Sequence, residues 1–235
     1  MKRIILTFAL FFVAFSIKSQ TVNTLTPAEK KSGWKLLFDG KSFAGWHNYR
    51  KKGIGERWVI SQGAMKLNVG AEEGGDIVTN EVFKGDFEFK IDWKIVPYAN
   101  NGVFFFVNES PAFKTMYESG LELQVIDNAI YKNEKKDNKH LVGDFFGILK
   151  ARNAQAKKPG EWNRYHVIFK KNVLRVSLNG SLIHNIDVNG SEWKTAVSQS
   201  FLKNSPFAKG RFEGRIGLQD WHSEVWYRNI KARKF

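Results

Sequence analysis

The sequence predicts an all-β fold, a sandwich or jelly roll of antiparallel strands. Polar and apolar residues alternate with a period of two in several segments, which is typical of strands with one buried face. These segments recur about every 8 to 15 residues and are separated by Gly and Asn turns, as in sandwiches and barrels. Helical periodicity is scarce, and no linker, repeat or low-complexity tract divides the chain.

The clearest strand covers residues 86–95. Its sequence, DFEFKIDWKI, alternates charged and apolar residues without a break. Successive side chains of a strand point to opposite faces. We therefore expect Phe87, Phe89, Ile91 and Trp93 to share one buried face, with the charged residues on the other.

Turn residues predict two β-hairpins. Residues 173–178 and 181–184 are joined by Asn179-Gly180, the pair that a type I′ turn favours because both of its positions take positive φ. Residues 58–60 and 64–67, joined by Ser61-Gln62-Gly63, indicate an earlier hairpin. Further strands are predicted at residues 102–107, 165–169, 215–219 and 224–232.

Two short helices are predicted. Thr26, Pro27 and Glu29 have the pattern of an N-cap, a first helical position and an acidic first turn. Residues 191–200 form the second candidate.

The first twenty residues have the three parts of a secretory signal peptide. Lys2 and Arg3 form a basic start, residues 4–17 are an apolar run, and Ser19-Gln20 form a polar exit. The run is shorter than the ~20 residues that a membrane-spanning helix needs, although an anchor or a buried helix is the alternative. We expect residues 1–20 to be cleaved and residues 21–235 to form one domain without a transmembrane segment, periplasmic or secreted.

Composition excludes some covalent links and bears on which partners the protein binds. The chain has no cysteine, which excludes disulfides and a lipoprotein anchor. Its formal net charge is +14, or +11 once Lys2, Arg3 and Lys18 leave with the signal. A basic balance can indicate nucleic-acid binding. The lysines are dispersed in pairs and no nucleic-acid motif is present, so we expect a solvated basic surface and no nucleic-acid partner.

Motifs along most of the chain resemble the keto-disaccharide hydrolase family. Residues 34–46, WKLLFDGKSFAGW, resemble its opening motif LFDGK-x-x-x-GW. The family's later motifs follow in order at residues 86–89 (DFEF), 120–127 (GLELQVID), 160–163 (GEWN), 178–180 (LNG), 217–222 (GLQDWH) and 225–230 (VWYRNI). Two positions depart from the pattern: Asn100-Asn101-Gly102 lacks the usual serine, and Trp221 separates Asp220 from His222.

The resemblance implies a concanavalin/laminin-G-like jelly roll of two curved antiparallel sheets. It also implies an enzyme that cleaves 3-keto-glucosides or 3-keto-disaccharides, and the predicted signal peptide would export it. A ketone at C3 makes the C2 hydrogen acidic, so a base can remove it, the group at C1 leaves, and water adds afterwards. This chemistry needs a base, a donor to the enolate oxygen and an acid.

No cofactor and no metal are expected for this reaction. The chain lacks a glycine-rich nucleotide-binding turn and a metal-binding motif, so a separate sugar dehydrogenase would have to install the ketone. The alternative function is a non-catalytic glycan-binding module on the same fold. A structural envelope protein is a third interpretation.

Candidate site residues come from two segments. Glu122 and Gln124 should point to one face of their strand, and His222 and Arg228 flank the turn between the last two strands. We expect these four to meet in one groove on the concave sheet, with Glu122 or His222 as the catalytic base. The predicted substrate-binding residues are Gln124, Asp127, His140, Asp144, Trp162, Gln219 and Arg228.

Several of these residues also have a purely structural interpretation. Arg228 could form an ion pair that fixes the last strand, for instance with Asp220. Trp162 and Trp221 are the best candidates for platforms on which a sugar ring stacks, because both are expected on loops.

Overall fold

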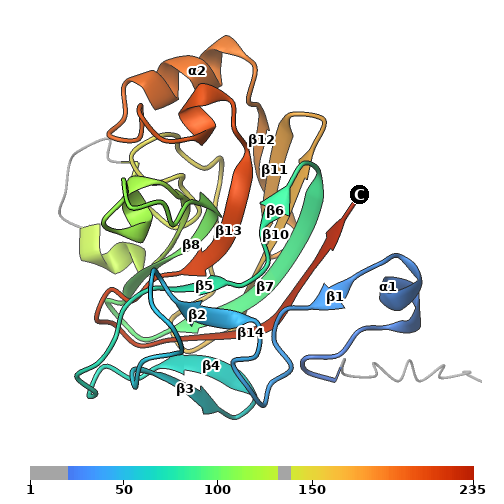
Figure 1. Cartoon of the computed structure of the whole chain (residues 1–235), viewed down its shortest axis with the longest axis vertical. Coiled ribbons are helices and arrows are strands. Elements are labelled where there is room, and N and C mark those ends of the chain that lie inside the picture. Colours follow the sequence, from blue (N-terminus) through green and yellow to red (C-terminus); the bar gives the residue numbers. More distant parts are fainter. Residues whose placement is uncertain (1–20, 132–138) are drawn as a thin grey trace, which may run out of the picture.

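The computed structural model describes residues 21–131 and 139–235, so the predicted signal peptide lies outside the described residues. Two antiparallel sheets pack face to face, and the helices are few and short (Figure 1). This architecture confirms the predicted all-β jelly roll. Within the described ranges, no helix is long and apolar enough to cross a membrane.

Eight strands form the first sheet and six form the second. The first runs in the spatial order β12 (Ser181–Asp187), β11 (Val173–Leu178), β10 (Asn163–Lys170), β7 (Phe87–Ile95), β14 (Val225–Lys234), β4 (Ala64–Leu67) and β3 (Trp58–Ser61), with β1 (Lys35–Leu36) paired to β14. The second runs β2 (Trp46–Asn48), β5 (Ile77–Thr79), β13 (Glu213–Leu218), β8 (Asn100–Val107) and β9 (Leu121–Ile126), with β6 (Phe83–Lys84) paired to β13.

Every strand predicted from alternation is present, with bounds shifted by a few residues. The helices α1 (Pro27–Lys31) and α2 (Ser191–Ser198) are also confirmed, and Thr26 and Glu29 form a capping box at the start of α1. Three short 3₁₀ helices, η1 (Met116–Glu118), η2 (Asn128–Tyr131) and η3 (Phe207–Lys209), complete the structure. The strands β1, β2, β5 and β6 were not predicted, because two or three residues are too few to show a period.

The core lies between the two sheets. Phe87, Phe89, Ile91 and Trp93 of β7 all face it and are at most 2% exposed, as predicted. The second sheet contributes Val103, Phe105, Leu121, Leu123 and Val125. Glu88 and Asp92 lie on the opposite face of β7, where the side chains of Arg233 and Arg164 pair with them and largely cover them.

The N-terminal segment of the described chain docks on the last strand. Asn23 and Asn229 exchange two hydrogen bonds, in which each backbone N–H donates to the side-chain oxygen of the other residue (2.7 and 2.8 Å). Farther along the segment, Glu29 pairs with Lys231, and β1 pairs with β14 in antiparallel register. Residues about two hundred positions apart thus form one side of the eight-stranded sheet.

The pairing of β5, β13, β8 and β9 determines which side chains lie together on the outer face of the six-stranded sheet. One row of opposed residues runs from Val78 through Gly217 and Phe104 to Glu122. Side chains in a row project to the same face. Gly217 has no side chain, and the thioether of Met116 occupies the space above it.

The adjacent row contains a second glycine. Gly102 pairs with Gln124, and the backbone N–H of Gln219 donates to the carbonyl of Gly102 (3.1 Å). A side chain at Gly102 would overlap the carboxyl group of Glu122, which therefore lies directly over this glycine. The row thus leaves a polar depression on the outer face, with Glu122 at its floor.

Candidate active site

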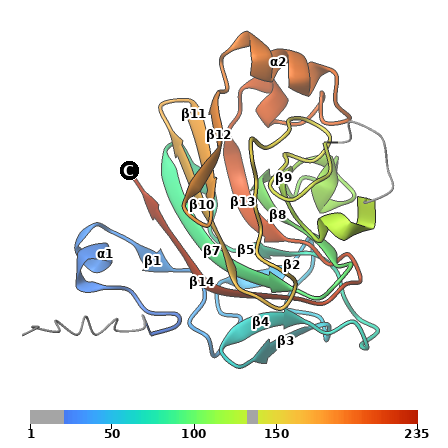
Figure 2. The same cartoon turned by 180° about the vertical axis from the view of Figure 1, so that it is seen from behind.

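A pocket of about 150 Å³ opens at this depression. It is formed where β9, the start of β8 and the end of β13 meet the loops that follow β8 and β9. Seen from either side, the green loop after β8 and the orange segment around α2 lie on the side of the six-stranded sheet (Figures 1 and 2). The pocket is lined by Asn100, Tyr117, Glu122, Gln124, Phe146, Gln219 and Trp221.

Glu122 is the acid at the floor of the pocket. Glu122 is only 6% exposed. Burial and the nearby carboxyl group of Asp76 raise the pKa of Glu122 well above its ordinary value. A carboxyl group with a raised pKa, at the base of a cavity, is suited to exchange a proton with a bound molecule.

Three amide side chains surround this acid. Gln124 donates from Nε2 to Oδ1 of Asn100 (2.8 Å), which leaves the amide nitrogen of Asn100 free to face the pocket. The buried Oε1 of Gln124 has no hydrogen-bond partner among the described residues. Such an atom is costly to bury alone, and a hydroxyl group of a bound sugar would satisfy it. Gln219 completes the polar floor.

A group of charged residues lies beside the pocket, at the ends of β5 and β13. Asp220 accepts hydrogen bonds from the backbone N–H of Gly75 (2.7 Å) and from Nη1 of Arg57 (3.2 Å). Its own backbone N–H donates to Oδ1 of Asp76 (2.9 Å). Burial and the Asp220 carboxylate raise the pKa of Asp76 to about 7, although the hydrogen bond from Asp220 opposes the shift. This clamp fixes Asp76 close enough to Glu122 to act on its charge.

His222 belongs to the same group. Nη1 of Arg57 lies 2.9 Å from Nδ1 of His222. Because a guanidinium can only donate, Nδ1 must accept, and the neutral ring then carries its proton on Nε2. Within the described chain, His222 is exposed and is not among the residues that line the pocket.

No group of three or more His, Asp or Glu side chains in the described ranges could hold a metal ion.

The model of one protein family, the 3-keto-alpha-glucoside-1,2-lyase-like domain, matches residues 33–233. The chain belongs to this family. This confirms the family predicted from the motifs and identifies an enzyme of the glycoside hydrolase type.

Two relatives agree with this assignment, and a more distant structure shares only the fold. A 3-keto-disaccharide hydrolase of Bacteroides thetaiotaomicron is 29% identical over 252 residues, covering 93% of this chain and 84% of that protein. A structure from Parabacteroides distasonis ATCC 8503, provisionally named a glycosyl hydrolase, is 28% identical with a TM-score of 0.80, covering 91% of this chain and 99% of that one. The carbohydrate binding module CBM66 of Bacillus subtilis, 13% identical with a TM-score of 0.50, covers 81% and 96% and shares the fold alone.

Three predicted site residues of this family member lie in the pocket: Glu122, Gln124 and Gln219. Three others lie close to it but outside its lining. Asp127 accepts hydrogen bonds from the backbone of Tyr98 and Ala129, and Asp144 accepts them from the backbone of Leu141 and Ala151. Both carboxylates hold turns in place. His140 stacks on Phe146 at 4.4 Å and supports the pocket wall.

The structure separates Arg228 and Trp162 from this pocket. The Arg228 guanidinium lies 3.8 Å from the centre of the Trp162 ring, and Arg228 is paired opposite Asp92 in the eight-stranded sheet. The prediction that Glu122, Gln124, His222 and Arg228 meet in one groove is therefore wrong for Arg228. The suggested ion pair of Arg228 with Asp220 is wrong as well, because Asp220 pairs with Arg57.

Sequence reasoning missed four residues of the site: Asp76, Asn100, Tyr117 and Phe146. They lie at the ends of strands, in a loop or, for Tyr117, in the single turn of η1, where no periodicity indicates a direction. Asp76 follows the sequence Glu-Glu-Gly-Gly, which is typical of a solvent-exposed loop. Trp221, which the sequence does single out as a platform, lines the pocket.

Proposed function

We propose that the protein is exported and that it cleaves 3-keto-glucosides or 3-keto-disaccharides by elimination followed by hydration. The observation that carries this proposal is the carboxyl group of Glu122, which is buried at the floor of a pocket of about 150 Å³ and has a raised pKa. The family relationship and the name of the Bacteroides relative support the substrate class.

The ionised Glu122 carboxylate removes the proton from C2 of the sugar. The electron pair moves onto the C3 oxygen, and the amide N–H groups of Asn100 and Gln219 donate to the resulting enolate. When the enolate collapses, the bond from C1 to the leaving oxygen breaks and a C1–C2 double bond forms. The proton now held by Glu122 passes to the leaving oxygen, so the carboxylate is regenerated. Water then adds at C1 and a proton returns to C2, which gives the free 3-keto sugar.

The substrate has to reach this site already oxidised. A sugar dehydrogenase acting in the same compartment would supply the ketone, because removal of the C2 proton requires it. Cleavage of residues 1–20 during export would place the enzyme in the periplasm or outside the cell. A single domain over residues 21–235 is consistent with the family match over residues 33–233.

Incubation with a 3-keto-glucoside and with its unoxidised parent tests this function. Release of the leaving group from the ketone alone is expected, and a transient product with a conjugated C1–C2 double bond should absorb in the ultraviolet. Equal cleavage of both compounds would contradict the proposal, because the ordinary two-carboxylate route has no need of the ketone.

The Asp76→Asn change should shift the pH dependence of the reaction. It removes the neighbouring carboxylate that disfavours ionised Glu122, so the pKa of Glu122 should fall, while burial keeps it above the ordinary value. The base acts only when ionised. We therefore expect the acid limb of kcat/KM against pH to move to lower pH.

The exposed Asp187→Asn change on β12 is the matched control and should leave this profile in place. An acid limb that is unchanged in Asp76→Asn, or that moves to higher pH, would show that Asp76 does not act on Glu122.

A further inference from the structure

Aromatic side chains surround the mouth of the pocket. Tyr117, Phe201 and Trp221 are 43%, 52% and 54% exposed, which is unusual for residues of this size. Tyr117 and Trp221 line the pocket directly. The Phe201 ring lies edge-on to two neighbouring rings. Its centre is 6.4 Å from the centre of the Tyr117 ring and 6.1 Å from that of the pocket residue Phe146. Exposed apolar groups that gather at one place mark a binding surface.

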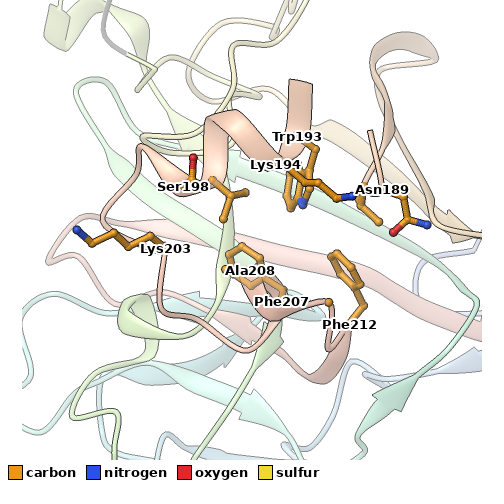
Figure 3. Close-up of a pocket in the computed structure, with 11 residues that line it drawn as sticks. Asn189, Trp193, Lys194, Ser198, Lys203, Phe207, Ala208 and Phe212 are labelled. Carbon is orange, nitrogen blue, oxygen red and sulfur yellow. The ribbon is translucent and has the colours of Figure 1, made fainter. Parts of the chain in front are cut away.

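Two of these rings, Phe146 and Phe201, are held in place by residues that pack behind or beside them. Phe146 has His140 stacked behind it, 4.4 Å away and nearly parallel. Leu202, next to Phe201, is 1% exposed and fixes that segment to the core. The helix α2 before this segment is anchored by Trp193, whose ring packs against Phe145 and Phe207. Figure 3 shows Phe207 and Phe212 beneath α2, in a hollow that Trp193 also lines.

The polar and apolar parts of the site are separated. The hydrogen-bonding residues Glu122, Gln124 and Gln219 are at most 8% exposed and form the floor, whereas the exposed aromatic rings form the mouth. A sugar with C2 above Glu122 would occupy the floor. The group attached to C1 must then extend to the mouth.

We infer that the mouth, formed by Tyr117, Phe146, Phe201 and Trp221, is a leaving-group subsite that favours a flat aromatic ring over a second sugar. This inference rests on the proposed function. An aromatic ring can stack on these side chains and bury apolar surface without loss of hydrogen bonds. A second sugar can also stack its C–H face on one of these rings, but the rings offer its hydroxyl groups few donors or acceptors, so those hydroxyl groups gain little from entering the mouth. Aryl 3-keto-glucosides are therefore the substrate class that this site fits best.

The test compares two 3-keto-glucosides of the same anomeric configuration, one with a phenyl and one with a glucosyl leaving group. Their intrinsic reactivities differ, so the quantity of interest is the change in the ratio of their kcat/KM values between wild type and a variant. We expect Phe201→Ala and Tyr117→Ala each to lower the phenyl-to-glucosyl ratio about five- to ten-fold. Leu182→Ala, which removes an exposed apolar side chain on β12, should leave the ratio unchanged.

Binding gives a second readout that does not depend on turnover. The Glu122→Gln protein should bind the phenyl compound more tightly than the glucosyl compound in calorimetry, and Phe201→Ala in the same background should remove the difference. A ratio unchanged in both aromatic variants, or equal binding of the two compounds, would overturn the inference. If wild type cleaves neither compound but the binding preference is present, the proposed reaction fails and the aromatic subsite stands.

Discussion

Replacing Glu122 by glutamine should lower kcat on a 3-keto-glucoside by about 10²–10⁴-fold, the usual contribution of a general base. Glutamine keeps the shape of the side chain over Gly102, but it cannot accept the C2 proton at neutral pH. The amides of Asn100, Gln124 and Gln219 remain in place to bind the sugar. We therefore expect the loss in kcat rather than in KM, provided that the chemical step limits turnover.

The control for this change is Glu192→Gln, which neutralises an exposed carboxylate in the first turn of α2 and should leave kcat unchanged. Full turnover by the Glu122→Gln protein would remove Glu122 from the mechanism. The base would then have to be sought among the groups beside the pocket, with His222 the first candidate to be substituted.

Adding one methyl group at Gly102 should be nearly as harmful. In Gly102→Ala the new side chain would overlap the Glu122 carboxyl group, which has no room to stay where it is. The carboxyl group would have to rotate away from the C2 proton. Because a displacement of about 1 Å at a reacting group can cost roughly 10²-fold in rate, we expect a loss of that size in kcat.

The backbone of Gly102 does not need the special conformations of glycine, so the fold should tolerate alanine there. A thermal unfolding curve close to that of wild type, together with the loss of activity, would separate a displaced base from an unfolded protein. Gly70→Ala is the matched control, since its new side chain would meet nothing closer than an ordinary contact at 3.6 Å. Wild-type kcat in Gly102→Ala would mean that the observed position of Glu122 is not the reactive one.

The alternation of residues in strands predicted two residues of the site, Glu122 and Gln124. It placed Glu122 and Gln124 on one face of β9, away from the core residues Leu121 and Leu123, and the structure confirms that face. Alternation predicts which residues share a face of one strand, but it does not predict which strands become neighbours. Only the family motifs could therefore place Glu122 and Gln219 in the same site.

The same motifs misplaced Arg228. Its strand, β14, joins the eight-stranded sheet, whereas β13, which ends just before Asp220, belongs to the six-stranded sheet. Asp220 therefore stays beside one sheet while Arg228, only a few positions later, lies in the other. The aromatic wall could not be predicted either, because Tyr117, Phe146 and Phe201 come together from three separate segments outside the strands, whose paths depend on tertiary packing.

The docking of residues 23–36 on β14 has a consequence for how the protein matures. A chain emerges from the ribosome, or from a translocation channel, with its N-terminal end first. Yet Asn23, Glu29 and β1 have their partners on β14, and so does the central strand β7. The eight-stranded sheet cannot close until the last residues have emerged. The early segments must therefore remain open to chaperones for the whole of synthesis or transport, and truncation of the final strand should leave a chain that never completes folding.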